Sequence, residues 1–268
     1  MILASHGIIA SSILQVDADW LAYYNRVIAA GGSLTTTEQN ATKTLVADLK
    51  ANGLWTPMKA IYPMVGASAA ACAQNLKSSS FTGTFSSGWT FASSGVTPNG
   101  TSAYFDTTFN PITQSQAQNN TFLSAYVRNN LAGGYDIANS SNLAGSGNPT
   151  YLITRFSGDL AYIGISDTTF GASIASTDSR GLWSGGTNSS LTQILYKNGS
   201  SIKSSSVSAN AFANFNLYLA ATNNVGTPLF FTAKQYAFAS ISDGLSGTQA
   251  SNFYTAVQAF QTTLSRQV

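Results

Sequence analysis

Hydrophobic positions recur at helical spacing near the start of the chain. From residue 17 to residue 31, an acidic cap is followed by apolar side chains at every third or fourth position, and a glycine pair ends the pattern. From residue 35 to residue 53, Thr35 and Glu38 have the spacing of a capping box, and an Asn-Gly pair supplies a left-handed stop. These two stretches predict a helical hairpin.

The end of the chain carries a third helical pattern. Ser246 and Gln249 again have capping-box spacing. We expect the helix that follows to pack on the central part of the chain, because its apolar residues share one face. They are Phe253, Val257, Phe260 and Leu264.

The pattern between residues 67 and 243 is different, because short runs of β-type residues alternate with clusters of turn-forming residues. Leu123, Ala125 and Val127 would share one face of a strand, as expected where one side of a sheet meets the core. Asn198–Gly199 fits a two-residue type I′ hairpin. The runs predicted as strands are 89–92, 102–107, 122–128, 151–156, 160–166, 191–197, 200–205, 215–221 and 234–241.

Residues 54–66 are rich in apolar and aromatic side chains and interrupted by proline, which is typical of a connector that packs onto a sheet. The predicted organisation is an N-terminal docking segment and helical hairpin over residues 1–66, then a sandwich with a closing C-terminal helix over residues 67–268. The predicted fold class is mainly β, an antiparallel sandwich with helices on both flanks.

Composition agrees with a folded β protein of weak electrostatic character. Apolar residues make up 44% of the 268 residues, charged residues only 8%, and the net charge is +2. Solvent-facing positions must therefore be filled by Ser, Thr, Asn, Gln and Gly, which helical proteins seldom show. No run of Lys or Arg could follow a phosphate backbone, so nucleic acid is not an expected partner.

The first residues of the chain are apolar but do not have the form of a signal peptide. They lack a Lys or Arg at the start, and His6 and Gly7 interrupt the apolar run. We expect residues 2–14 to be an ordered or docking segment that an oligomer buries. No stretch of the sequence approaches the roughly 18 consecutive apolar residues of a membrane-spanning helix.

Few residues suit catalysis or metal binding. Glycoside hydrolysis needs two carboxyl groups roughly 5 to 10 Å apart, and the single glutamate, Glu38, belongs to a capping box. The aspartates are mostly isolated in sequence, although Asp106 and Asp136 could pair across strands. His6 and Cys72 are each the only residue of their kind, and the setting of Cys72 among alanines predicts a buried thiol. We therefore predict no catalytic residues, no metal site and no cofactor.

Carbohydrate recognition is the remaining chemistry that the residues favour, because it uses aromatic faces beside amide or guanidinium groups. Trp183 lies beside a predicted Ser-Gly-Gly-Thr-Asn loop that ends at Asn188. Neighbouring elements offer further aromatic and basic side chains, although each aromatic could instead belong to the core. The candidate ligand-binding residues are Trp183, Asn188, Tyr135, Tyr151 and Arg155.

The C-terminal third carries a resemblance to a known fold family. Residues 193–199 form a strand and an Asn-Gly hairpin, residues 215–224 a second strand, and residues 236–250 a last strand followed by a helix start. This succession resembles the end of concanavalin A-like, laminin G-type jelly rolls, and the resemblance covers roughly residues 67–268. Calcium-binding members of that superfamily carry Asp and Asn ligands in loops, and no such cluster occurs here.

A second resemblance lies nearer the N-terminus. Several pieces of the chain are similar to a recurrent group of tailed-phage and metagenomic virion proteins. They are Trp20–Leu49, residues 58–66, 75–77 and 88–90, the Thr-Pro-Asn-Gly-Thr sequence of residues 97–101, and Tyr104. The resemblance implies a jelly roll displayed on the surface or an appendage of a virion, as a head fibre, decoration, spike or tail component. It also implies a homo-oligomer that contacts sister subunits or other virion proteins through its N-terminal segment.

Three functions are therefore compared. The first is a non-enzymatic bacteriophage virion structural protein. The second is a carbohydrate-binding adhesin that recognises a host-surface glycan. The third is a glycan-cleaving enzyme, which the single glutamate disfavours.

Overall fold

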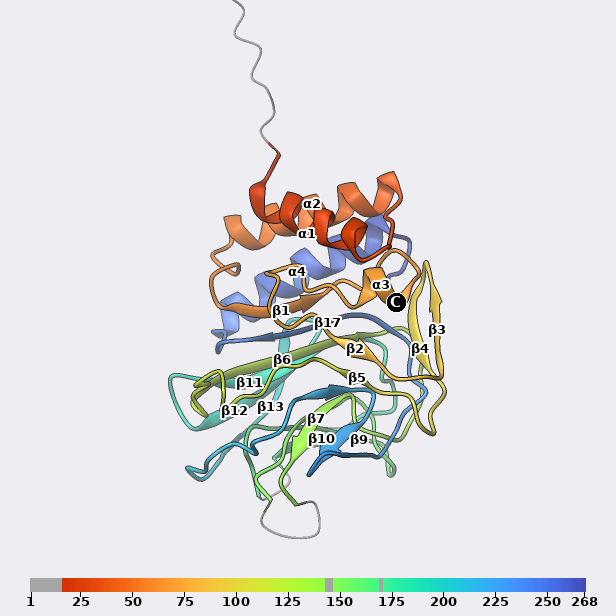
Figure 1. Cartoon of the computed structure of the whole chain (residues 1–268). Coiled ribbons are helices and arrows are strands. Elements are labelled where there is room, and N and C mark those ends of the chain that lie inside the picture. The colour runs from red at the N-terminus through yellow and green to blue at the C-terminus, as the bar shows by residue number, and fades with distance from the viewer. Residues whose placement is uncertain (1–15, 143–146, 169–170) are drawn as a thin grey trace, which may run out of the picture.

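The computed structural model describes residues 16–142, 147–168 and 171–268, and in them helices lie over one face of two stacked sheets (Figure 1). No helix among these residues is long and apolar enough to cross a membrane. The helices are α1 (Ala18–Ala29), α2 (Thr36–Ala51), α3 (Ala69–Cys72) and α4 (Gly247–Thr263).

The sheet beneath the helices, called sheet A, is antiparallel. Its strands in spatial order are β13 (Ser200–Ser206), β12 (Thr192–Lys197), β11 (Gly181–Asn188), β6 (Asn120–Val127), β17 (Tyr236–Ser242), β4 (Gly95–Pro98) and β3 (Trp89–Ala92). An eighth strand, β1 (Met58–Tyr62), pairs with β17.

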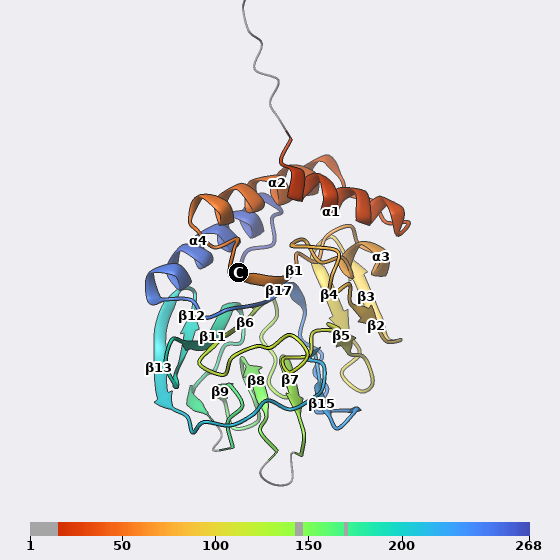
Figure 2. The same cartoon turned by 60° about the vertical axis from the view of Figure 1, so that its left-hand side comes forward.

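The second sheet, called sheet B, lies on the side away from the helices (Figure 2). Its strands in spatial order are β10 (Ala172–Ala175), β9 (Leu160–Gly164), β8 (Thr150–Ile153), β7 (Ile137–Ser140), β14 (Tyr218–Leu219), β5 (Phe105–Asp106) and β2 (Thr84–Phe85). A hairpin of β15 (Thr222–Asn224) and β16 (Thr227–Leu229) joins it through parallel pairing of β15 with β7.

The predicted fold class is confirmed: the chain is mainly β, with two antiparallel sheets in a sandwich and short helices near its N- and C-terminal ends. Strands distant in sequence are neighbours in both sheets, as in jelly-roll sandwiches. The predicted hairpin also forms, because Lys197 pairs with Ser200 and both Asn198 and Gly199 have positive φ angles of 49° and 75°.

Local sequence signals explain where the helices begin. Asp17 accepts hydrogen bonds from the first backbone N–H groups of α1. The capping box of α2 is complete, since Glu38 N donates to Thr35 Oγ1 and Thr35 N donates to Glu38 Oε2. The other carboxylate oxygen of Glu38 accepts from Gly66 N at 2.8 Å, so this acid holds a helix start and a loop together. Ser246 and Gln249 form the equivalent box of α4.

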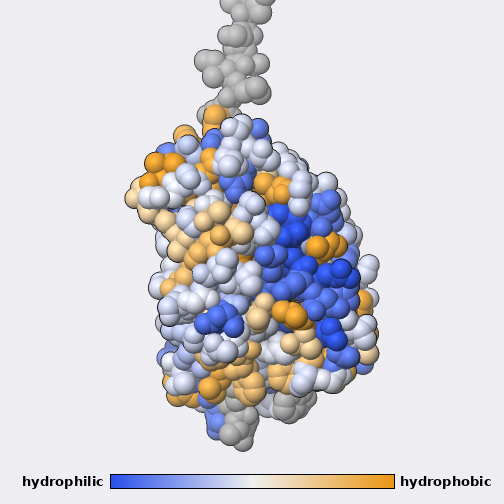
Figure 3. All heavy atoms as spheres, turned by 90° about the vertical axis from the view of Figure 1, so that its right-hand side faces the viewer, coloured by the Kyte–Doolittle hydropathy of each residue, from blue (hydrophilic) through white to orange (hydrophobic). Residues whose placement is uncertain are grey.

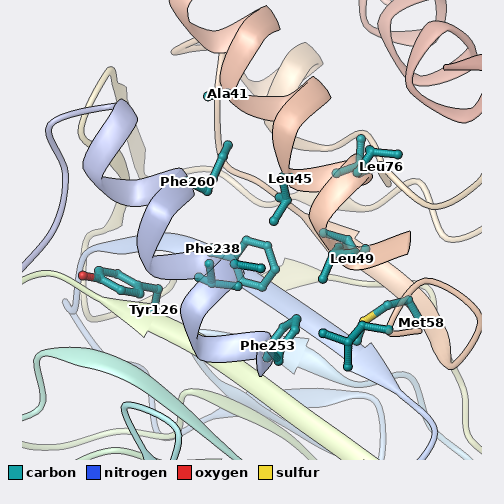
Figure 4. Close-up of a cluster of buried hydrophobic side chains, with 14 of the residues drawn as sticks. Ala41, Leu45, Leu49, Met58, Leu76, Tyr126, Phe238, Phe253 and Phe260 are labelled. Atoms are coloured by element: carbon teal, nitrogen blue, oxygen red, sulfur yellow. The ribbon is translucent and has the colours of Figure 1, made fainter. Parts of the chain in front are cut away.

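Two hydrophobic cores share sheet A. One lies between the sheets and contains Leu123, Ala125 and Val127, the β6 residues that the alternation placed on one face. The other lies between sheet A and the helices, where Leu45, Phe238 and Phe253 meet (Figure 4). Each large apolar side chain buried there contributes about 1.5 to 3 kcal/mol, so the helices are an integral part of the fold.

Arg266, which follows α4, is buried and hydrogen-bonded to several segments of the chain. The Arg266 guanidinium donates to the carbonyls of Met64 (2.7 Å), Pro63 (3.1 Å) and Ala237 (2.9 Å), and to Gln261 Oε1 (2.9 Å). Burial lowers the pKa of Arg266 to about 10. These bonds tie the chain end to the segment after β1 and to β17.

Several elements were not predicted, among them α3, β4, β7 and β10, and two further segments differ from the structure that was predicted for them. Residues 58–62, predicted as part of a connector, form strand β1 instead, and the division of the chain at Gly66 stays a prediction. The Ser-Gly-Gly-Thr-Asn sequence, predicted as a loop, lies inside β11 between β6 and β12. A side chain at Gly185 would lie 3.0 Å from Ile163, and one at Gly186 would lie 1.9 Å from the Thr121 carbonyl oxygen. Glycine is therefore needed here for packing, not for a turn.

Candidate functional site

The outer face of sheet B carries a cluster of aromatic side chains. Tyr151 and Ile153 on β8 point to this face, and their neighbour Leu152 points into the core between the sheets. Tyr162 on β9 lies beside Ile153, its partner in the strand register. Tyr135 and Phe156, from the loops before β7 and after β8, complete a small hollow. We call these five residues the aromatic hollow.

Phe230, which directly follows the β15–β16 hairpin, extends this cluster toward solvent. Its ring centroid lies 5.3 Å from that of Tyr135 and 6.3 Å from that of Phe156. Its carbonyl oxygen accepts a hydrogen bond from Tyr135 N at 2.9 Å, which fixes the backbone beside the hollow. Phe230 is 48% exposed, so it is accessible from solvent beside the hollow. Figure 3 shows hydrophobic atoms at the end of the molecule opposite the helices.

The size of the hollow limits what it can hold. Its volume is about 50 Å³, far below the roughly 300 to 1,000 Å³ of pockets that enclose a small molecule. It can accept a methyl-sized group or lie against one face of a ring. Burial raises the pKa of Tyr135, so its phenol stays neutral and the hollow stays uncharged.

A charged pair, Arg155 and Asp159, lies beside the hollow. Arg155 precedes Phe156, and its guanidinium donates from Nε to Asp159 Oδ1 at 2.8 Å and from Nη1 to Asn130 Oδ1 at 2.9 Å. A guanidinium has five N–H donors, so these two bonds orient it and leave others for a ligand. As a partly exposed pair, Arg155 and Asp159 add little stability.

The structure brings together three of the five predicted ligand-binding residues. Tyr135 and Tyr151 line the aromatic hollow and Arg155 lies beside it. The sequence analysis missed Phe156, Tyr162 and Phe230. Tyr162 does alternate with Ala161 and Ile163 in a predicted strand, but that pattern does not say which face is exposed.

Trp183 does not lie at an exposed position beside a loop, as the sequence analysis predicted. It is only 1% exposed and packs between the sheets, where its Nε1 donates to the Ser179 carbonyl at 2.9 Å. The Lys197 ammonium group lies 4.7 Å from the centre of its ring. Because Trp183 belongs to strand β11 and not to a loop, its ring offers no surface to a ligand.

Asn188 is exposed but lies elsewhere. It is the last residue of β11, and Gly181 is the first. Just before Gly181, the backbone N–H of Ser179 donates to the Asn130 Oδ1 that also accepts from Arg155, so the start of β11 lies near Arg155. At 3.3 Å per residue, Asn188 is roughly 23 Å along the strand from Gly181. It therefore does not act together with the aromatic hollow.

Asp106 and Asp136, which the sequence analysis considered as a pair, have separate partners, whereas Asp17 and Asp19 both bind the Lys50 ammonium group at 2.7 and 2.6 Å. Asp136 is fully buried against Lys234, and Asp106 accepts hydrogen bonds from Asn216. Two larger hollows, of about 180 and 200 Å³, border the helices and contain Asp48 and Glu38 respectively, without an aromatic ring. In the described ranges no three His, Cys, Asp or Glu side chains are grouped so that they could hold a metal ion.

Tyr151 carries a buried hydroxyl group for which the described residues offer no hydrogen-bond partner. We expect Tyr151→Phe to leave the free energy of unfolding unchanged or to raise it by up to about 1 kcal/mol, because it removes a desolvated group. Tyr62→Phe is the control, since the Tyr62 hydroxyl bonds to the Phe81 and Thr107 carbonyls and its loss should cost about 1 to 2 kcal/mol. Urea unfolding followed by circular dichroism measures both, and a large loss for Tyr151→Phe would contradict the assignment.

The chain is similar to known proteins in fold but not in sequence. No family model and no curated protein sequence matches it. A mutant sialidase of Trypanosoma rangeli with trans-sialidase activity superposes with a TM-score of 0.51 and 9% identity, over 81% of this chain and 39% of the sialidase.

Two further structures are similar at lower scores. Domain 4 of an extracellular arabinanase of Geobacillus stearothermophilus, in complex with arabinotriose, gives a TM-score of 0.48 at 13% identity, over 74% of this chain and 98% of that domain. The binding domain of botulinum neurotoxin serotype D gives 0.46 at 11%, over 75% of this chain and 52% of the domain. At 9% identity, the similarity to the sialidase shows a shared β-sandwich fold alone.

Proposed function

We propose that this protein is a non-enzymatic carbohydrate-binding domain that recognises a neutral glycan through the aromatic hollow and Phe230. The observation that carries the proposal is the exposed ring of Phe230 beside Tyr135 and Phe156, on a sheet face that no helix covers. Aromatic rings pack against the apolar faces of sugars, and a shallow, uncharged site suits a neutral saccharide.

The polar surroundings support the same proposal. Sugar hydroxyl groups need donors and acceptors fixed at the edge of the stacking surface. Arg155, held by Asp159 and Asn130, provides oriented donors next to Phe156. The hollow itself contains no carboxylate pair that could cleave a glycosidic bond.

A glycan array tests the proposal. We expect the unaltered protein to bind a related set of neutral glycans, and Phe230→Ala to weaken binding about tenfold, or about 1.4 kcal/mol, because a stacking surface is lost. Val225→Ala is the matched control, since Val225 is also exposed and apolar on the β15–β16 hairpin but does not line the hollow. No bound glycan, or equal effects of both substitutions, would contradict the proposal.

The virion role is a second proposal, based on the sequence resemblance. The arrangement of layers is compatible with it, because a protein held through its helices would present the aromatic hollow outward (Figure 1). Antibodies against the purified protein should then label intact phage particles. Absence of the chain from purified particles would contradict this role and leave the glycan-binding proposal untouched.

A further inference from the structure

The aromatic hollow has a buried floor and a more open rim. Tyr151 and Ile153 are each 3% exposed and Tyr135 is 9% exposed, whereas Phe156 and Tyr162 are only partly buried. The ring of Tyr135 meets the rings of Tyr151 and Phe156 at interplanar angles of 82° and 77°. The rings therefore stand around the hollow as walls instead of stacking on one another.

The volume of the hollow admits a substituent of a sugar but not the sugar ring itself. A buried water molecule needs roughly 10 to 15 Å³ of such space, so about 50 Å³ holds a methyl group and the atom that bears it. Pockets that enclose a whole small molecule begin at roughly 300 Å³. A sugar that lies against Phe230 can therefore place one small substituent in the hollow.

The lining of the hollow favours an apolar substituent. Its five side chains are aromatic or aliphatic. The Tyr151 hydroxyl extends over β9, because a Cβ added at the cross-strand partner Gly164 would lie 2.8 Å from this oxygen. A sugar hydroxyl placed in the hollow would leave water without regaining its full set of hydrogen bonds, which costs about tenfold in affinity. A methyl group has no such bonds to lose and gains about fourfold by leaving water.

We propose that the hollow takes the methyl group of a sugar substituent, so that the protein selects methyl-bearing neutral sugars over matched sugars without that methyl group. The inference rests on the proposed glycan-binding function and narrows its ligand class. Tyr135 connects the two parts of the site, since its ring centroid lies 5.3 Å from that of Phe230 and 5.9 Å from that of Tyr151. One sugar can therefore stack on Phe230 and reach the floor of the hollow.

Neutral sugars carry such a methyl group in two ways, in an acetamido group or in a 6-deoxy sugar. Matched glycans on the array distinguish these sources, with N-acetylglucosamine compared with glucose, and L-fucose with L-galactose, in otherwise identical oligosaccharides. We expect the methyl-bearing member of at least one pair to bind at least fourfold more tightly. The pair that responds identifies the source of the methyl group.

Ile153→Phe tests whether the hollow causes this preference, because the larger side chain fills the hollow from its floor. We expect the affinity ratio within the responding pair to fall from at least fourfold to about one. Ile112→Phe is the matched control and should keep the ratio, since Ile112 is 42% exposed and does not line the hollow. Phe230→Ala should weaken both members of the pair equally, because it removes the stacking surface that they share.

A second variant covers the case in which Ile153→Phe does not fold, as judged by circular dichroism. Ile153→Ala removes the side chain that the methyl group contacts, so the ratio should fall at least twofold. Glycan binding without a preference in either pair would overturn this inference and leave the proposed function intact, as would a preference that the folded Ile153 variant retains in full. An array without any bound glycan would overturn both.

Discussion

Lys234→Met is expected to lower the free energy of unfolding by about 3 to 5 kcal/mol, because it leaves the Asp136 carboxylate buried without a counter-ion. Both side chains are fully buried, and Lys234 Nζ lies 3.0 Å from Asp136 Oδ2. The same carboxylate accepts hydrogen bonds from Thr154 N at 2.7 Å and from the Tyr236 hydroxyl at 2.7 Å. This cluster joins the start of β7 in sheet B to β17 in sheet A, so its loss weakens the contact between the sheets.

A double substitution separates the effect of the buried charges on stability from the effect of side-chain packing. Lys234→Met with Asp136→Asn removes both charges, and we expect it to recover at least half of the loss of the single variant. Arg180→Met is the control, because the exposed Arg180–Asp178 pair is screened by solvent and should contribute little to stability. Chemical unfolding of all three variants measures these differences. A Lys234→Met protein as stable as the parent would contradict the proposed role of the pair.

Gly186→Ala is expected to destabilise the protein by about 3 kcal/mol or more, or to prevent folding. An added Cβ would lie 1.9 Å from the Thr121 carbonyl oxygen and 2.8 Å from Phe122 Cα, both backbone atoms of β6. Backbone in the centre of a sheet cannot move aside without breaking the β6–β11 pairing, so the strain is not relieved by a side-chain rotation.

Gly247→Ala is the matched control for this substitution. Gly247 is the first residue of α4, and an added Cβ there would meet only the Tyr196 hydroxyl oxygen, 4.0 Å away. Alanine in a helix is favoured over glycine by up to about 1 kcal/mol, so Gly247→Ala should be neutral or stabilising. Thermal unfolding distinguishes the two variants, and equal melting temperatures would show that β11 does not need glycine at position 186.

Helices α1, α2 and α4 could be predicted from the sequence because their signals are local, whereas the short helix α3 was not predicted. Thr35 with Glu38, and Ser246 with Gln249, lie three residues apart and form the capping boxes that their spacing indicates. The Asn198–Gly199 hairpin is equally local. In each case the residues that determine the conformation are neighbours along the chain, so no knowledge of distant contacts is needed.

Strand β11 could not be predicted for the opposite reason. Gly185 and Gly186 usually indicate a turn. Here glycine is required because an added Cβ would meet the Ile194 carbonyl oxygen of β12 and Ile163 of the facing sheet at position 185, and the backbone of β6 at position 186. Ile163 and β6 are more than 20 residues away in sequence. Because part of β11 was predicted as a loop, Trp183 was expected to be exposed beside that loop. The predicted binding site was therefore centred on a residue that lies in the core.

Only part of the aromatic hollow could be predicted from the sequence. Alternation of residues along a strand assigns side chains to two faces of the sheet but does not show which face is exposed to solvent. Tyr151 lies in a predicted strand, yet its outward direction follows from the order of β7, β8 and β9 in sheet B. Phe230 lies outside every predicted strand and reaches the hollow through the β15–β16 hairpin. Proximity of this kind depends on topology rather than on sequence pattern.

The central claim is that the aromatic hollow and Phe230 form a carbohydrate site. Its most direct test is nuclear magnetic resonance of the aromatic C–H groups during titration with the strongest glycan from the array. We expect the resonances of Tyr135, Phe156, Tyr162 and Phe230 to shift together and to saturate, while those of Trp20 and Trp183 stay in place. Saturating shifts confined to the helix layer or to the Asn188 end of β11, or no shift at any glycan concentration, would contradict the account.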